Sequence, residues 1–181
     1  MGDGAPWIWN QQQTVAPGAV AIVDFHHGTD RLWKVGRALH GDSRQAKAWS
    51  KKWIKNLYKG KVVALIGELA AHVDARGQPP KDCAEDDPRK VLADAHRYFT
   101  NNADRMRYDE YRRKRYPIGS GVVESSCRHI VGLRMKRTAT MEWTEANAEA
   151  MVQLRCLSAG GDWDRFWGFD KLWEHVRRLA I

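Results

Sequence analysis

Apolar residues recur every three or four positions along most of the chain, and this pattern predicts a mostly α-helical protein. Each apolar stripe covers one face of its helix, so the helices are expected to pack against one another rather than to stand alone. Between them lie short polar connections that contain glycine or proline. The pattern predicts helices around residues 32–39, 46–57, 62–73, 91–98 and 151–154.

One short segment has the composition of a strand instead. Residues 19–23 form an apolar run with β-branched side chains, which is typical of a buried strand. An isolated strand leaves its backbone groups without partners, so this strand requires a sheet. We therefore expect one or two short strands in a truncated α/β fold, whose other strands precede Met1.

Local signals mark where several elements begin. Asp87 before Pro88 is typical of a helix N-cap followed by proline at the first helical position. Residues 117–121 give the strongest loop signal, and Glu124 falls in the first turn of the helix expected after them. A last helix is expected after Gly161, with an apolar packing stripe formed by Trp163, Phe166, Trp167, Leu172, Trp173, Val176 and Leu179.

The charge of the chain points to an acidic partner. The net charge is +8, and residues 105–137 hold ten basic side chains against three acidic ones. Such a concentration suits a DNA backbone, because each neutralised phosphate releases counterions. A solvated helical face is the alternative. The residues predicted to contact DNA are Arg112, Arg113, Lys114, Arg115, Arg128, Arg134, Lys136 and Arg137.

The composition of the chain also bears on the cellular compartment in which the protein is expected. The three cysteines have no C-x-x-C spacing, which indicates reduced thiols rather than a disulfide framework. No apolar run approaches the roughly 20 residues that a membrane span needs, and nothing resembles a signal peptide. A cytoplasmic protein without membrane contact is predicted.

Two carboxylates are candidates for chemistry. Asp3 lies between two glycines, a setting that suits either an exposed active-site carboxylate or an ordinary turn. Glu124 either interacts with the helix dipole and with Arg128, or ligates a divalent metal. Hard cations such as Mg²⁺ need oxygen ligands, and two-metal phosphoryl transfer needs carboxylates from different elements.

Two other groups of residues fit a metal site or a catalytic site less well. Asp24 and His27 form a D-x-x-H motif, but the scattered cysteines do not supply the ligand spacing of a zinc site. Cys127 and His129 are two residues apart on a helix, so their side chains point in different directions. Neither a zinc centre nor a Cys–His nucleophile is favoured.

Several blocks together resemble one family. Residues 116–127 closely resemble the block around the last catalytic glutamate of ISKra-type insertion-sequence transposases, and residues 2–10 look like the block with their second aspartate. Residues 24–27 are similar to the [C/D]-x-x-H signature of Mutator-like transposases. The tail at 161–167 also resembles the family's ending. The resemblance covers Met1 to about Trp167, and the glutamate block is its most specific part.

The resemblance implies a single partial ribonuclease H-like catalytic domain with a DDE triad. Residues 1–41 would form its strand and helix core, 42–116 a helical insertion, and 117–181 the glutamate helix with C-terminal helices. Asp3 would be the second catalytic carboxylate and Glu124 the third, both ligating Mg²⁺ or Mn²⁺. A competing alignment makes Asp24 the second aspartate. Asp3 is preferred because the D-x-x-H motif follows the catalytic aspartate in this family.

The implied activity is metal-dependent nicking and strand transfer on double-stranded DNA, at element ends and target, with a homo-oligomer possible. No residue of this sequence matches the first aspartate of the triad. We therefore expect a bacterial transposase remnant that is inactive alone. The alternative is a non-enzymatic, basic DNA-binding or regulatory protein derived from a transposase.

Overall fold

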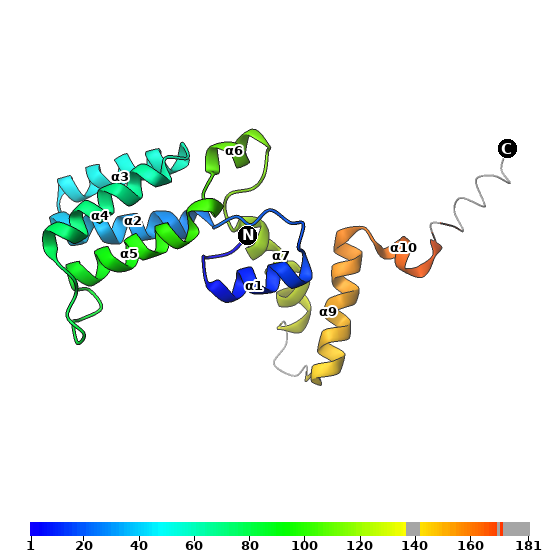
Figure 1. The fold of residues 1–181 in the computed structure, drawn as a ribbon. Helices are drawn as coiled ribbons and strands as arrows, with labels where there is room; N and C mark the ends of the chain where they lie inside the picture. Colours follow the sequence, from blue (N-terminus) through cyan, green and yellow to red (C-terminus); the bar gives the residue numbers. More distant parts are fainter. Residues whose placement is uncertain (137–141, 170, 172–181) are drawn as a thin grey trace. The chain divides into compact units, whose positions relative to one another are not determined.

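A computed structural model describes residues 1–136, 142–169 and 171 of the chain (Figure 1). The described residues are mostly helical, as the apolar pattern predicted. The chain divides into two compact units, Met1–Ser120 and Gly121–Ile181. The division falls within the loop predicted at residues 117–121.

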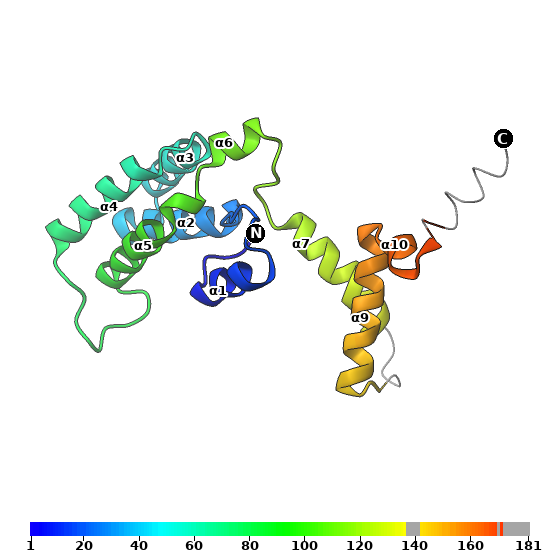
Figure 2. The ribbon, with the colours of Figure 1, turned by 45° about the vertical axis from the view of Figure 1, so that its right-hand side comes forward.

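Four helices make the core of the first unit. Helix α2 packs against α3 and α5, and α4 packs against α5 (Figures 1 and 2). Their fully buried leucines, such as Leu32, Leu57 and Leu65, come from the apolar stripes of the sequence and supply hydrophobic stabilisation. The bounds are Phe25–His40 for α2, Arg44–Tyr58 for α3, Val62–Arg76 for α4 and Pro88–Asn102 for α5.

Helices α2 and α3 approach closely at Gly36. A Cβ atom added there would lie 2.9 Å from the carbonyl oxygen of Ala46 and would also meet Ser50 Oγ. The buried Ser50 hydroxyl donates a hydrogen bond of 3.1 Å to the carbonyl oxygen of Leu32. The absence of a side chain at Gly36 therefore allows this helix contact.

The first residues and the segment before α2 run parallel. Gly2 and Val23 form an isolated parallel bridge, in which Gly2 N donates to Ile22 O at 3.1 Å and Asp24 N donates to Gly2 O at 2.8 Å. Helix α1 (Pro6–Val15) connects the two segments. Parallel segments joined through a helix have the connectivity of a βαβ unit.

The strand predicted over residues 19–23 is wrong in extent. Within the described residues only Val23 of this run has sheet pairing. On its other side, Val23 N donates to Arg105 O at 3.1 Å, so the end of a short helix (η1, Ala103–Arg105) occupies that edge. Two buried tyrosines complete the surroundings: Tyr108 OH donates to Val23 O at 3.0 Å, and Tyr111 OH lies 3.4 Å from Ala21 O.

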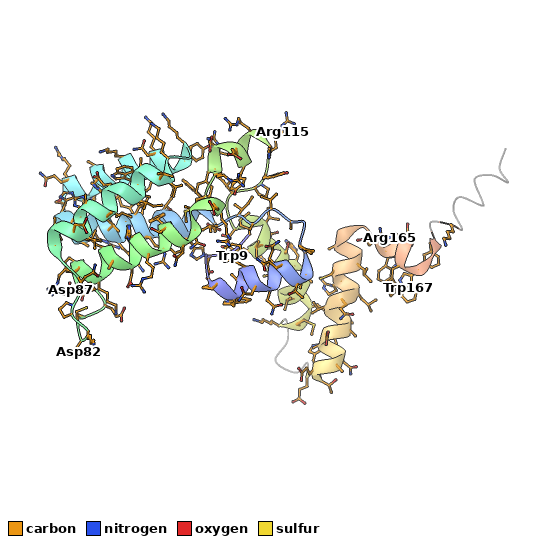
Figure 3. All side chains as sticks on the ribbon, viewed as in Figure 1. Trp9, Asp82, Asp87, Arg115, Arg165 and Trp167 are labelled. Carbon is orange, nitrogen blue, oxygen red and sulfur yellow. The ribbon has the colours of Figure 1, made fainter. Side chains whose placement is uncertain are left out.

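Helix α6 (Tyr108–Arg113) ends within the run of basic residues from Arg112 to Arg115. Lys114 is its C-cap, and Arg115 has a φ of 58°, in the left-handed region that ends a helix. Figure 3 shows Arg115 beyond α6, far from Asp82 and Asp87, which lie by the connection between α4 and α5.

The second unit begins with α7 (Gly121–Ser126), and Glu124 lies in its first turn as predicted. A π-helical segment, η2 (Cys127–Gly132), and the short α8 (Leu133–Met135) follow. The π turn interrupts the α-helical repeat of the helix expected after residues 117–121, because it adds a residue to the repeat.

Helix α9 (Glu145–Gly160) has Thr144 as its N-cap, whose hydroxyl accepts from Asn147 N. Arg155 on α9 donates from Nε to Ile130 O at 2.7 Å and also bonds His129 O, which joins α9 to η2. Helix α10 (Trp163–Trp167) ends at Gly168, with a φ of 73°. The predicted stripe residues from Leu172 onward, and Arg137, lie outside the described residues.

No described helix is both long and apolar enough to cross a membrane.

Candidate functional site

Asp3 and Asp24 directly follow the two bridged residues, Gly2 and Val23. Because the paired segments run parallel, both aspartates lie at the same end of the pair. Active-site groups of α/β proteins gather at this end of parallel strands. The structure therefore brings together two acidic residues that the sequence had offered as competing candidates.

Asp3 is exposed at this edge. Its Oδ1 accepts a 2.9 Å hydrogen bond from Ala5 N, and its backbone carbonyl accepts one of 2.9 Å from Tyr98 OH. Gly4 follows with a φ of 100°, and a Cβ there would lie 2.6 Å from Tyr98 Cε2. Glycine is required for this turn, which holds the Asp3 backbone against α5.

Asp24 has a different environment, because its side chain is only 1% exposed. It caps α2: Oδ1 accepts from His26 N at 2.6 Å and from His27 N at 3.3 Å. Burial alone would raise the pKa of the Asp24 carboxyl, but hydrogen bonds from Ser120, His26 and His27 outweigh burial and lower the pKa. The carboxylate stays ionised and serves as an acceptor for protein groups.

A cavity of about 620 Å³ adjoins Asp3. Its cations are held over aromatic rings: the Arg31 guanidinium carbon lies 3.9 Å from the Tyr98 ring centroid, and that of Arg105 lies 4.9 Å from the Trp9 ring centroid. His27, the other end of the D-x-x-H motif, also lines the cavity. A carboxylate and several cations thus share one cavity in the first unit.

Tyr98 links this cavity to the Asp3 turn. Burial raises the pKa of its phenol, the nearby Arg31 lowers it, and Asp3 and Asp24 raise it further, with a net increase. The phenol therefore remains protonated and can donate to the Asp3 carbonyl. Arg97 at the rim is paired with Asp94 at 2.7 Å, so its charge is partly compensated.

Arg31 and Tyr98 were not predicted as site residues. Arg31 lies four residues after His27 on α2, a spacing that places both on one helix face. This spacing could have identified Arg31. Tyr98 contacts a residue 95 positions away in the sequence, so its apolar spacing indicated only a core position.

The predicted DNA-contacting residues are divided between the units. In the first unit, the Arg112 guanidinium lies 3.7 Å from the Tyr58 ring centroid, Arg113 pairs with Asp109 at 3.3 Å, and Lys114 and Arg115 are exposed. An exposed ion pair such as Arg113–Asp109 contributes little to the free energy of unfolding. In the second unit, the described ones, Arg128, Arg134 and Lys136, are also exposed.

Among the described residues, no group of three or more His, Cys, Asp or Glu side chains gathers to hold a metal. Cys83, Cys127 and Cys156 are free, and Cys127 and His129 lie exposed on the π-helical segment. Glu124 is in the other unit from Asp3. No family model, curated protein or solved structure matches this chain.

Proposed function

We propose that this chain is a DNA-binding unit of the DDE transposase type, in which Asp3 and Glu124 ligate Mg²⁺ or Mn²⁺. One observation carries the proposal: the exposed Asp3 carboxylate follows one of two parallel bridged segments and adjoins a cavity lined by His27, Arg31 and Arg105. Carboxylate oxygens suit hard divalent cations, and the arginines suit a phosphodiester. The resemblance of the blocks around Asp3 and Glu124 to ISKra-type transposases supports the same function.

Asp3 is the better ligand of the two aspartates at this edge. Asp24 is buried, and its Oδ1 already accepts from two backbone N–H groups of α2. Moving that oxygen onto a metal would leave the start of α2 without its cap, which typically costs about 1 kcal/mol. The other oxygen of Asp24, Oδ2, has no hydrogen-bond partner among the described residues but is buried. Asp3 is exposed and has a carboxylate available without such a loss.

The proposed fold is ribonuclease H-like. The parallel pairing of Gly2 with Val23 through α1 supports it, because that connectivity is the one expected around a second catalytic aspartate. In this proposal, the helices α3, α4 and α5 belong to the helical insertion that the resemblance implies before the glutamate.

Bound metal ions would supply activation of the attacking oxygen and stabilise charge on the phosphate. The protein's own part is to present Asp3 and Glu124 as ligands and to hold the phosphodiester with cavity cations. A DDE site uses three carboxylates, and the family motifs match two in this sequence. We therefore propose DNA and metal binding, and no strand cleavage by this chain alone.

The test compares Mn²⁺ binding, measured by electron paramagnetic resonance, in the full chain and in single variants. Asp3→Asn and Glu124→Gln are each expected to weaken Mn²⁺ binding at least about tenfold. The matched controls are Asp82→Asn, an exposed aspartate on the connection after α4, and Glu145→Gln, another glutamate in the first turn of a helix. Equal affinity in all four variants would contradict the proposed metal site.

A non-enzymatic DNA-binding or regulatory protein is the second candidate. The observation that favours it is the exposure of basic side chains such as Lys114, Arg115 and Arg128, which require no metal to bind phosphates. Duplex binding should weaken steeply with salt for either candidate. If Asp3→Asn and Glu124→Gln retain DNA affinity and no protein binds Mn²⁺, this second function is correct. Absence of duplex binding at low salt would exclude both.

A further inference from the structure

Helix α3 and the turn after it carry a high density of positive charge. Residues 44–61 contain seven basic residues and no acidic one, and they lie outside the basic region predicted at residues 105–137. Four lysines repeat at intervals of four residues and are all exposed: Lys47, Lys51, Lys55 and Lys59. Residues four apart lie on one face of a helix, about 6 Å apart along its axis. These four residues therefore form a lysine stripe that runs along α3 to its C-cap, Lys59.

The lysine stripe is not balanced by acidic side chains. In the part of the chain that the structure describes, every ion pair involves other residues than these four. Like charges four residues apart destabilise a helix, so the stripe does not stabilise α3 itself. The opposite face of α3, with Trp53 and Leu57, is buried in the core and holds the helix in place. The exposed charge is therefore free to attract an anionic partner.

Helix α6 continues this surface beyond the end of α3. The two helices are in contact, and Figures 1 and 2 show α6 beside the end of α3. The Arg112 guanidinium carbon lies 3.7 Å from the ring centroid of Tyr58, the last residue of α3. A Cβ atom added at Gly60 would overlap the Asp109 side chain, so the turn after α3 also lies against α6. Stacking on Tyr58 thus holds Arg112 next to the lysine stripe.

The two acidic residues of α6 do not cancel its positive charge, because both are paired with arginines. Asp109 pairs with Arg113 at 3.3 Å, and Glu110 pairs with Arg107 at 3.6 Å. The basic residues of α6 and its C-terminal end that are exposed and outside these pairs are Arg112, Lys114 and Arg115. The surface formed by α3 and α6 therefore remains positive over its whole length.

We propose that the lysine stripe of α3 and the basic residues of α6 form one surface that binds the phosphate backbone of duplex DNA. Lysines in such a row suit a backbone, because each neutralised phosphate releases counterions and no base contact is needed. An anionic membrane fits less well, since the apolar face of α3 is buried and cannot enter a bilayer. The inference rests on the DNA-binding part of the proposed function. It adds a contact surface within the first unit that needs neither Asp3 nor a metal.

The test measures binding of a short duplex of mixed sequence to the full chain by fluorescence anisotropy, over a range of salt concentrations. The stripe variant is Lys51→Gln with Lys55→Gln, at the centre of the lysine stripe. Glutamine has nearly the helix propensity of lysine, so α3 should be retained. The variant is expected to bind the duplex roughly tenfold more weakly. The slope of log affinity against log salt should fall in magnitude by about 2, because two phosphate contacts are lost.

The matched control is Lys81→Gln with Lys90→Gln, which removes the same charge from the connection between α4 and α5 and from the first turn of α5. Figure 3 shows this connection, labelled at Asp82, far from Arg115. The control variant should bind the duplex within about twofold of the wild-type affinity, with the same slope, since charges beyond a Debye length are screened. Urea denaturation of the stripe variant should show unchanged or higher stability, because repulsion along α3 is relieved. A merely structural role of the lysines would instead lower it.

The possible failures are distinguishable. Equal affinity and slope in the stripe and control variants would overturn this inference and leave the proposed function in place. Binding to vesicles of phosphatidylcholine and phosphatidylserine that is lost in the stripe variant, while duplex binding is kept, would assign the surface to a membrane and overturn the inference. A wild-type chain that does not bind the duplex at low salt would overturn the DNA-binding function and this inference together. Mn²⁺ affinity should be the same in the stripe variant and the wild-type chain.

Discussion

Gly4 keeps the Asp3 carboxylate at the open edge because only glycine fits between that turn and Tyr98. Its φ of 100° is in a region that other residues rarely adopt, and an added Cβ would lie 2.6 Å from the Tyr98 ring. Gly18 has no neighbouring atom within 4 Å of an added Cβ, so it provides a matched comparison.

The first prediction is that Gly4→Ala lowers the free energy of unfolding by about 1–3 kcal/mol, through backbone strain and the clash with Tyr98. Gly18→Ala should change it by less than about 1 kcal/mol. Urea denaturation of both variants measures the difference. Equal stability of the two variants would mean that the Asp3 turn is not held against Tyr98.

The Asp87 cap of α5 gives a prediction for pH. Hydrogen bonds from the Arg89 side chain and backbone lower the pKa of Asp87 to about 2. Because the folded-state pKa is below the unfolded value of about 3.9, the cap stabilises the protein above that value. The stabilisation is lost as the pH falls through about 2. A carboxyl ¹³C NMR titration should give a midpoint near 2, and Arg89→Ala should raise it. A wild-type midpoint near 3.9 would contradict the interaction.

Among the contacts between helices, the one between α2 and α3 depends most clearly on a single residue, Gly36. Gly36→Ala should lower the free energy of unfolding by about 1–3 kcal/mol, since its Cβ would overlap Ser50 and the Ala46 backbone. Gly67, exposed on α4, has open space around it. Gly67→Ala should therefore raise the free energy of unfolding by up to about 1 kcal/mol. Thermal unfolding followed by circular dichroism compares the two, and a stabilising Gly36→Ala would contradict the packing.

The helices of the first unit could be predicted from the sequence because their signals are local. Apolar spacing predicted α3 and α4, and the Asp87–Pro88 pair predicted the start of α5, which the structure confirms. The extent of the strand predicted at 19–23 could not be determined from local signals. The pairing of Val23 depends on Gly2 and Arg105, which are distant in the sequence.

The candidate site was predicted only in part for the same reason. Asp3, Asp24 and His27 were identified from short motifs, but the burial of Asp24 depends on residues distant in the sequence, such as Gly2, whose carbonyl oxygen accepts from Asp24 N. The Arg31–Tyr98 contact joins α2 to α5 and leaves no local pattern. The π turn after Glu124 also has no signal in the apolar spacing.

Across the whole molecule, the two units differ in burial. Every buried residue among the described positions lies in the first unit, between Trp9 and Tyr111. The described part of the second unit exposes large apolar side chains, including Val122, Phe166 and Trp167. Stability is therefore concentrated in residues 1–120.

A fragment of residues 1–120 is expected to unfold cooperatively, with a midpoint close to that of the same region in the full chain. Urea denaturation of the fragment, and hydrogen exchange of the full chain, check this. Exchange should be slower in α2 and α5 than in α9, since α9 has no fully buried residue. Loss of cooperative unfolding in the fragment would show that the first unit needs the second.

The central claim, that Asp3 and Glu124 ligate Mg²⁺ or Mn²⁺, is tested most directly by the Mn²⁺ affinity of single and double variants. The four proteins are the wild-type chain, Asp3→Asn, Glu124→Gln and the double variant, each measured by electron paramagnetic resonance. Each single change should weaken Mn²⁺ binding at least about tenfold, and the double variant should bind Mn²⁺ no more tightly than either single variant. Mn²⁺ affinity equal to that of the wild-type chain in all three variants would contradict the metal-ligand role of both carboxylates.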